Sequence, residues 1–257
     1  NVVYDVMGGA IFVENGNEKY NKIMYNMASF VKYSSSLLND DITPATIWVT
    51  NPMNTVSHNS VGGSTHFGIW YRMHTHPEDT SYDPHVCPQL DMLGEFKNNT
   101  VHSIGWFGLW IFEHYFPHDG ESCDKQTIVP AVFEDSNFWR MEKGVEFFEV
   151  GGMILKNTTI AETRHAGVEW KRVWGTSWGD SAMEDVTIQA RTSQYIPEIA
   201  EKTAIIMPAA SGVTVDGVDI IGFGKRDDKM NTGISGTERE IKKFTFLVTS
   251  VYLLVRD

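Results

Sequence analysis

The chain has 257 residues, of which 42% are hydrophobic and 12% aromatic, so it can close a large core and extensive disorder is excluded. Its 33 acidic and 21 basic residues give a formal net charge of −12, which opposes the basic face that nucleic acids require. We therefore expect no nucleic-acid partner. No stretch approaches the roughly 18 consecutive apolar residues of a membrane-spanning helix. The chain also lacks an initiator Met and a signal-peptide pattern, which predicts a fragment of a larger protein.

A short element recurs along the chain, in which Asn is followed by one variable residue and a β-branched residue. The Asn residues are Asn1, Asn21, Asn54 and Asn99, and the β-branched anchors of the seven coils are Val3, Ile23, Val56, Val101, Ile160, Ile188 and Val215. Units this short cannot bury an apolar face alone, so they must stack as a solenoid. The units hold strand-like runs and no helical stripe. The pattern predicts an all-β, right-handed parallel β-helix of about seven coils, spaced about 4.8 Å apart.

A longer repeat orients the side chains. Phe67-Gly68-Ile69-Trp70, followed by His74, recurs as Phe107-Gly108-Leu109-Trp110, followed by His114. Because side chains alternate along a strand, inward Ile69 and Leu109 predict further inward and outward positions. The predicted inward residues are Phe67, Tyr71, Phe107 and Ile111, and the predicted outward residues are Gly68, Trp70, Arg72, Gly108, Trp110 and Phe112. The predicted outer column is Phe12, Lys32, Trp70, Trp110 and Glu169. Two adjacent coils should thus share an aromatic outer face.

The sequence predicts one domain over residues 1–257, with inserted loops at about 73–95 and 113–145. Each loop holds one cysteine, Cys87 or Cys123, and stacking of consecutive coils should bring the two together. We expect a disulfide, which suits an oxidising compartment; the alternative is two free thiols. The recurring Asn residues are best explained by amide ladders along the solenoid axis, which are structural and not catalytic.

Two sequons, at Asn98 and Asn157, are candidate N-glycosylation sites that fall at predicted turns. Unmodified turn residues are the alternative, because Asn tolerates left-handed backbone conformations.

Histidines crowd the inserts and the strands that lead into them. His74, His76, His114 and His118, with His85 nearby, could hold zinc or copper, and His114 should stack on His74. Their spacing matches no defined ligand framework, so ordinary loop histidines are the alternative. Asp40-Asp41 and Asp227-Asp228 could bind calcium or be solvated turn residues. We expect no obligatory cofactor.

A glycan site is conceivable at the aromatic face. Glycan cleavage needs two carboxylates across a glycosidic bond. The candidate acids are Asp79, Asp83, Glu95 and Glu113, and the candidate ligand-binding residues are Trp70, Arg72, Trp110, His74 and His114. Arg72 could neutralise an acidic sugar. The alternative is that the inserts bury both tryptophans as ordinary packing.

Several runs resemble the fibrocystin-L family. They are Asn1 to Tyr4, Met7 to Ala10, Ser36 to Ala45, Trp48 to Pro52, Thr65 to Gly68, Trp70 to Met73, Leu93 to Phe96, Asn98 to Ser103, Trp106 to Gly108, Trp110 to Glu113 and Tyr115 to Pro117. Cys87 and Cys123 also stand where such sequences carry cysteines. The stretch from Gly236 to Asp257 has no counterpart that we can match.

This resemblance implies a segment of a very large cell-surface or ciliary protein. Such proteins combine immunoglobulin-like repeats, G8 domains and parallel β-helix repeats ahead of a single membrane span. Their relatives include hyaluronan-degrading proteins that pair a G8 domain with a β-helix. No catalytic residue is carried over, because no hyaluronan-cleaving motif aligns with named positions here.

We therefore expect a non-enzymatic extracellular β-helix module that acts as a stiff spacer and interaction surface. Its partner would be a glycan or an extracellular protein. The alternative is a module that binds or cleaves a glycosaminoglycan such as hyaluronan along the Trp70 and Trp110 face. Self-association through the coil ends is a third possibility, because a solenoid end leaves open strand edges.

Overall fold

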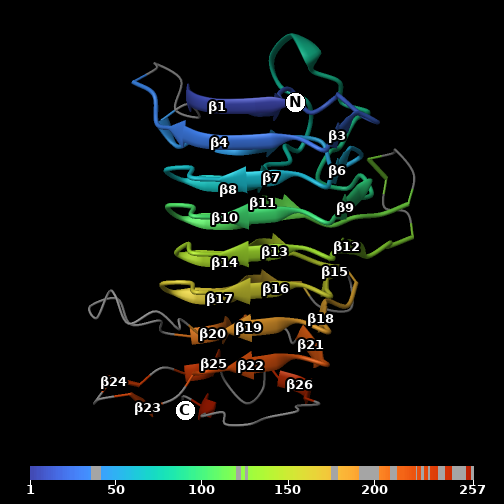
Figure 1. The fold of residues 1–257 in the computed structure, drawn as a ribbon. Helices are drawn as coiled ribbons and strands as arrows, with labels where there is room; N and C mark the ends of the chain where they lie inside the picture. Colours follow the sequence, from blue (N-terminus) through green and yellow to red (C-terminus); the bar gives the residue numbers. More distant parts are fainter. Residues whose placement is uncertain are drawn as a thin grey trace.

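The chain winds into a parallel β-helix, shown as a stack of coils in Figure 1. The computed structural model describes residues 1–35, 42–119, 123–124, 127–174, 179–190, 203–208 and 213–223, and then five short strands between residues 225 and 255. The predicted all-β fold is confirmed. Asp40-Asp41 and Asp227-Asp228 lie outside the described residues. In the described part of the chain, no helix has the length and apolar character needed to cross a membrane.

Three parallel sheets run the length of the stack. Within the described residues, sheet A holds, in spatial order, β1 (Val2–Met7), β4 (Met27–Lys32), β7 (Ser60–Gly62), β10 (Thr100–His102), β13 (Asn137–Trp139), β16 (Thr159–Ala161), β19 (Thr187–Gln189) and β22 (Asp219–Ile221). Sheet B holds β2 (Ile11–Val13), β5 (Ala45–Val49), β8 (Phe67–Tyr71), β11 (Phe107–Tyr115), β14 (Lys143–Val150), β17 (Ala166–Val173), β20 (Thr203–Ile206), β25 (Thr232–Gly236) and β27 (Leu253–Val255).

Sheet C completes each coil. Its described strands are β3 (Lys22–Met24), β6 (Thr55–Ser57), β9 (Glu95–Lys97), β12 (Ala131–Glu134), β15 (Met153–Lys156), β18 (Ala182–Glu184), β21 (Val213–Asp216) and β26 (Ile241–Phe244). Outside the three sheets lie an antiparallel pair, β23 (Lys225–Arg226) and β24 (Lys229–Met230), and one short 3₁₀ helix, η1 (Asp79–Ser81).

Like positions stack in register from coil to coil. Ile69 of β8 pairs with Leu109 of β11, and both side chains are fully buried, as predicted. The inward column of sheet B contains Ile47, Ile69, Leu109, Val145, Val168 and Ile205. Each of these residues has no exposed surface, so one apolar core continues along the stack.

The structure contains a coil that the sequence pattern missed. Strands β12, β13 and β14 form it, and β12, β13 and the start of β14 lie in the region predicted to be the second insert. The actual connection runs only from the end of β11 at Tyr115 to the start of β12 at Ala131. Phe138 is the inward residue of β13 in this coil. Ser136 stands two residues before it, where other coils have an Asn, so this coil lacks the Asn signature. The first insert lies between β8 and β9, at residues 72–94.

The recurring Asn residues belong to two different corners of the coil. Asn1, Asn26, Asn59 and Asn99 precede sheet A strands, and the Oδ1 of each of the last three accepts a hydrogen bond from the Asn of the preceding coil. Their Nδ2-to-Oδ1 distances are 2.9, 2.9 and 3.0 Å. Asn21 and Asn54 instead precede sheet C strands and form a second ladder at 3.0 Å. The expected amide ladders are therefore present, but Asn1 and Asn21 are not equivalent positions.

The corner from sheet C to sheet A is a sharp two-residue turn. Its first residue has positive φ in seven described coils: Tyr25, His58, Asn98, Asp135, Asn157, Asp185 and Gly217. Its second residue is the ladder Asn or its substitute. Asn, Asp and Gly adopt this backbone conformation most easily, which explains their frequency at this corner.

The predicted orientation of Phe67 and Phe107 is wrong. Both residues pack in an outer cluster with Trp70 and Trp110, whereas Gly68 faces the core. A Cβ atom on Gly68 would lie 2.5 Å from Val101 Cγ1 and 2.6 Å from the carbonyl oxygen of Gly108. Two successive residues, Gly68 and Ile69, thus face inward, and the strict alternation assumed from the sequence breaks at this position.

Replacing Asn59 by Ala should lower the free energy of unfolding by about 1–3 kcal/mol, because buried amide partners would lose their hydrogen bonds. The side chain of Asn59 accepts from Asn26, and its Nδ2 bridges to Ile23 O at 2.9 Å and to Asn99 Oδ1 at 3.0 Å. Urea unfolding followed by circular dichroism measures the change. The control is Asn17→Ala at an exposed Asn, and equal losses in both variants would contradict a stabilising ladder.

Candidate functional site

The outer face of sheet B carries a column of aromatic rings. Phe12, Trp48, Trp70 and Trp110 occupy equivalent positions in consecutive coils. We call these four residues the aromatic column. Trp48 and Trp70 stack with ring centroids 5.7 Å apart, and Trp70 and Trp110 stack at 5.1 Å. The predicted pairing of Trp70 with Trp110 is therefore present, but Lys32, which was assigned to this column, lies in β4 of sheet A.

The indole rings pack face to face. The interplanar angles are 19° for Trp48 with Trp70 and 22° for Trp70 with Trp110, and Phe112 stacks on Trp110 at 4.4 Å. Trp70 is consequently only 5% exposed. A sugar stacks on an open aromatic face, and the described part of the structure offers none at Trp70. The geometry therefore favours buried rings over a sugar-stacking platform. Neighbouring rings, and not the inserts, account for this burial.

A cluster of charged side chains continues the same column. Trp110 pairs in register with Glu146, and Glu146 pairs with Glu169 of the following coil. Trp110 Nε1 donates a hydrogen bond to Glu146 Oε1 at 2.9 Å. The Nζ of Lys143 lies between the two carboxylates and contacts both, and Lys171 Nζ lies 2.8 Å from Glu169. We call Lys143, Glu146, Glu169 and Lys171 the sheet B charge cluster.

The two carboxylates of this cluster have opposite pKa shifts. Burial raises the pKa of Glu146 above its usual value, against the opposing effect of Lys143. Burial acts in the same direction on Glu169, but hydrogen bonds from Lys143 and Lys171 outweigh it and lower the pKa of Glu169. A carboxyl with a raised pKa beside one with a lowered pKa is an arrangement used in general acid–base chemistry, although buried ion-pair networks produce it too.

Sequence reasoning found Glu169 but missed Lys143 and Glu146. A signal was present, because Lys143-Gly144-Val145-Glu146 and Ala166-Gly167-Val168-Glu169 have the glycine and inward apolar residue of Phe107-Gly108-Leu109-Trp110. The expectation of a loop over residues 113–145 obscures this signal.

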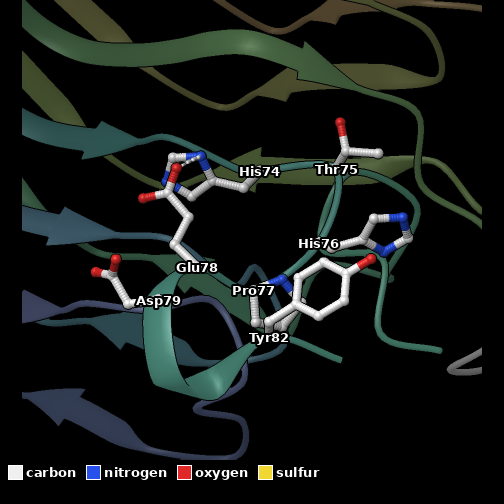
Figure 2. A pocket seen from close by; sticks show the side chains of 7 residues that line it. All are labelled: His74, Thr75, His76, Pro77, Glu78, Asp79 and Tyr82. Atoms are coloured by element: carbon white, nitrogen blue, oxygen red, sulfur yellow. Dashed lines mark ion pairs between the residues drawn. The ribbon is translucent and has the colours of Figure 1, made fainter. Parts of the chain in front are cut away.

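The first insert forms a pocket of about 700 Å³. Figure 2 shows its lining side chains, which are His74, Thr75, His76, Pro77, Glu78, Asp79 and Tyr82. His74 Nδ1 lies 3.0 Å from a carboxylate oxygen of Glu78, and His76 packs edge-on against Tyr82 with centroids 5.8 Å apart. Of the predicted site residues, the pocket therefore collects His74, His76 and Asp79, but not the tryptophans.

The predicted catalytic acids lie on separate elements. Asp79 is in η1, Glu95 begins β9 of sheet C, and Glu113 lies in β11 of sheet B. Glu95 is 2.6 Å from Lys97 Nζ, and this hydrogen bond lowers the pKa of Glu95. Asp83 accepts a hydrogen bond from the backbone of His85. The contacts described for these acids are thus with other partners, and the structure does not assemble them into a pair across the aromatic column.

The predicted histidines are also dispersed. His114 does not stack on His74; its Nε2 lies 2.9 Å from Glu149, which also pairs with Arg172. His118 lies in the second insert, where its backbone N–H donates to Leu90 O at 2.9 Å. Among the described residues, only His76, Cys87 and Cys123 bring three potential metal-ligand atoms together, within 4.8 Å of one another. The four-histidine arrangement is therefore not assembled in the described part of the chain.

Cys87 and Cys123 form a disulfide in the structure, as expected. It joins the two inserts, which leave consecutive sheet B strands β8 and β11. The sequons Asn98 and Asn157 are exposed at the sharp corner between sheets C and A. Their side chains contact His58 and Asp135, the residues of the preceding coil at the same corner. Exposure makes both Asn residues accessible, and glycosylation stays a prediction.

Replacing Lys143 by Met should destabilise the fold by about 2–3 kcal/mol, because two buried carboxylates would lose the cation between them while Lys171 remains beside Glu169. Without Lys143, burial and mutual repulsion raise both carboxyl pKa values in the folded state, which then binds protons more tightly than the unfolded chain. Stability of the variant should therefore rise as the pH falls, and its deficit should shrink between about pH 7 and about pH 5.

Chemical denaturation of both proteins at each pH checks this expectation. The control is Lys171→Met, which removes a cation whose side chain is 44% exposed and should cost less than about 1 kcal/mol. A deficit at Lys143 that did not change with pH would contradict the assigned role.

Comparison with known proteins gives the chain relatives. A family model described as CEMIP beta-helix matches residues 1–109. The chain is 43% identical to mouse and human fibrocystin-L over 234 residues, which is 88% of this chain but 6% of each relative. It is 28% identical to the human cell surface hyaluronidase CEMIP2 over 207 residues, which is 62% of this chain and 15% of that protein. The chain thus spans only a small part of these relatives. The resemblance to fibrocystin-L is confirmed, and this chain is a β-helix segment related to fibrocystin-L over most of its length.

Proposed function

We propose that the chain is an extracellular β-helix module that acts as a stiff structural and interaction element of a large cell-surface or ciliary coat protein. The observation that carries this proposal is the continuity of the three parallel sheets over one core. The nine described strands of sheet B, at a spacing of about 4.8 Å, give a rod about 40 Å long.

The side-chain ladders support a stiff rod. Bending the stack requires neighbouring coils to separate on one side, which would stretch the amide ladders and the stacked rings of the aromatic column. Both sets of contacts run along the rod axis, as do the backbone hydrogen bonds between strands. The Cys87–Cys123 disulfide suits the oxidising conditions outside the cell. The relative described as a cell surface hyaluronidase is consistent with such a location.

The proposed interaction surface lies at the N-terminal end. Here β1, β2 and β3 are edge strands of the described sheets. Large apolar side chains on this end are between 53% and 70% exposed: Val2, Tyr4, Met7, Met27, Phe30 and Tyr33. We call these six residues the N-terminal apolar patch. Next to it, a hollow of about 210 Å³ is lined by the core-facing Val3, Ile11 and Ile23, together with polar neighbours.

Exposed apolar patches of this kind mark interaction sites. A second copy of the chain offers an apolar patch of matching chemistry. The proposed interaction is therefore self-association at this end of the β-helix.

Sedimentation velocity over a range of concentrations tests this interaction. Wild-type protein should associate as its concentration rises, and Tyr4→Lys combined with Met27→Lys should abolish association, because two charges would be buried in the contact. The matched control is Ile221→Lys, which changes an exposed apolar residue in β22, the last described strand of sheet A. A wild-type monomer at every concentration, or equal effects of both changes, would contradict this surface.

A second candidate function is binding or cleavage of a glycosaminoglycan. It is favoured by the sheet B charge cluster, which places a carboxyl with raised pKa beside one with lowered pKa, and by the relative described as a hyaluronidase. In this reading Glu146 is the acid and Glu169 the base. Lys143 or Lys171 would neutralise a uronate.

Incubation with defined glycosaminoglycans, including hyaluronan, separates the two functions. The structural module should neither retain the polymer on immobilised protein nor shorten it, as judged by gel electrophoresis of the chains. Retention or shortening that is lost in Glu146→Gln, but kept in Glu134→Gln at a half-buried glutamate of sheet C, would replace the structural proposal with the carbohydrate one.

A further inference from the structure

We propose that His76, Cys87 and Cys123 bind one zinc ion when the disulfide between the two cysteines is reduced. The Nδ1 of His76 lies 3.5 Å from Cys87 Sγ, and the three potential ligand atoms all lie within 4.8 Å of one another. Two thiolates and one imidazole are a donor set that zinc prefers. This site differs from the four-histidine arrangement considered from the sequence, because it shares only His76 with it.

Two of the three ligands are positioned without the disulfide. His76 and Cys87 belong to the same insert, and His76 Nδ1 lies 3.0 Å from the carbonyl oxygen of Val86, the neighbour of Cys87. The carbonyl oxygen of Cys87 accepts hydrogen bonds from the N–H groups of Leu90 and Asp91, at 2.8 and 3.2 Å. These contacts hold the turn around Cys87, so cleavage of the sulfur–sulfur bond leaves His76 and Cys87 close together. Cys123 then supplies the third ligand from the other insert.

The surroundings favour a cation and give it access. His76 lines the pocket of Figure 2, and the carboxylates of Glu78 and Asp79 line the same pocket. A hydrated ion can therefore approach the imidazole from an acidic, open side. Three protein ligands leave a fourth tetrahedral position for water or a small ligand. The imidazole must bind zinc through Nδ1, so its proton moves to Nε2 and the zinc–nitrogen bond replaces the hydrogen bond from Nδ1 to Val86 O.

The chemistry balances in two steps. A dithiol reductant donates two electrons and two protons, so the Cys87–Cys123 bond breaks, two thiols form, and the reductant becomes a disulfide. Zinc then displaces the proton from each thiol, and two protons pass to solvent as two zinc–sulfur bonds form. In the oxidised protein the sulfurs are bonded to each other and supply no thiolate. Zinc binding should therefore depend on the redox state.

Cobalt(II) titration of the full chain tests the proposal, because tetrahedral cobalt with thiolate ligands gives intense visible bands and a sulfur-to-metal charge-transfer band. Reduced wild-type protein should bind one cobalt ion per chain with these bands, and zinc should displace it. The oxidised protein should show no such bands. His76→Ala should weaken binding by more than the roughly 10- to 100-fold loss typical of an outer-shell change.

His85→Ala is the matched control, since His85 is an exposed histidine of the same insert outside the three-residue group. It should bind cobalt as wild type does. Circular dichroism of the reduced chain should keep its β-sheet signal, because the main core cluster does not include Cys87 or Cys123. Equal binding by oxidised and reduced protein, unchanged binding in His76→Ala, or loss of the β-sheet signal on reduction would each overturn the proposal.

Discussion

Stacking at one fixed spacing is the constraint on which the rest of this molecule depends. Because each coil lies directly over the last, a residue type chosen for one coil meets its own equivalent in the next. Amides therefore meet amides in the Asn ladders, and rings meet rings in the aromatic column. A buried Asn would ordinarily leave donors and acceptors unsatisfied, but here each one satisfies its neighbour. The same rule brings Glu146 over Glu169, and Lys143 must then lie between them to offset the repulsion.

The rule also decides what the outer face of sheet B can do. An aromatic side chain that stands alone presents a flat face to a ligand, whereas one that stands in a column presents only its edge. Trp70, with a ring on either side, belongs to the second kind. Lys143, Glu146 and Glu169 of the charge cluster, further along the column, are buried by similar mutual contacts. Both features stabilise the rod. A ligand could reach these side chains only if their packing contacts opened.

Much of the fold could be predicted from the sequence because the repeat copies are nearly identical at key positions. The pairs Phe67 with Phe107, Ile69 with Leu109 and Trp70 with Trp110 are in register in the structure. The pairing of Cys87 with Cys123 followed from the same register. The coil around Phe138 escaped because Ser136 replaces the ladder Asn, and a hydroxyl accepting from Asn99 N continues the ladder without the sequence signature.

Other features could not be read from alternation or spacing alone. Phe67 points outward because Gly68 turns toward the core beside Val101, which depends on contacts between coils. The Asn-containing element marked two corners of the coil, and nothing in a single copy distinguishes Asn21 from Asn1. The site residues were the least predictable. The sequence predicts that Asp79, Glu95 and Glu113 border the aromatic face, but in the structure they lie on three different elements.

The left-handed corner between sheets C and A has a consequence for the outside of the rod. Asn98, Asp135 and Asn157 occupy this corner in three successive coils. The two sequon asparagines are therefore two coils apart, about 10 Å along the axis, on a single ridge. Sugar chains attached there would project side by side from this ridge. They would shield one flank of the molecule and leave sheet B, with its tryptophans and paired glutamates, uncovered by carbohydrate.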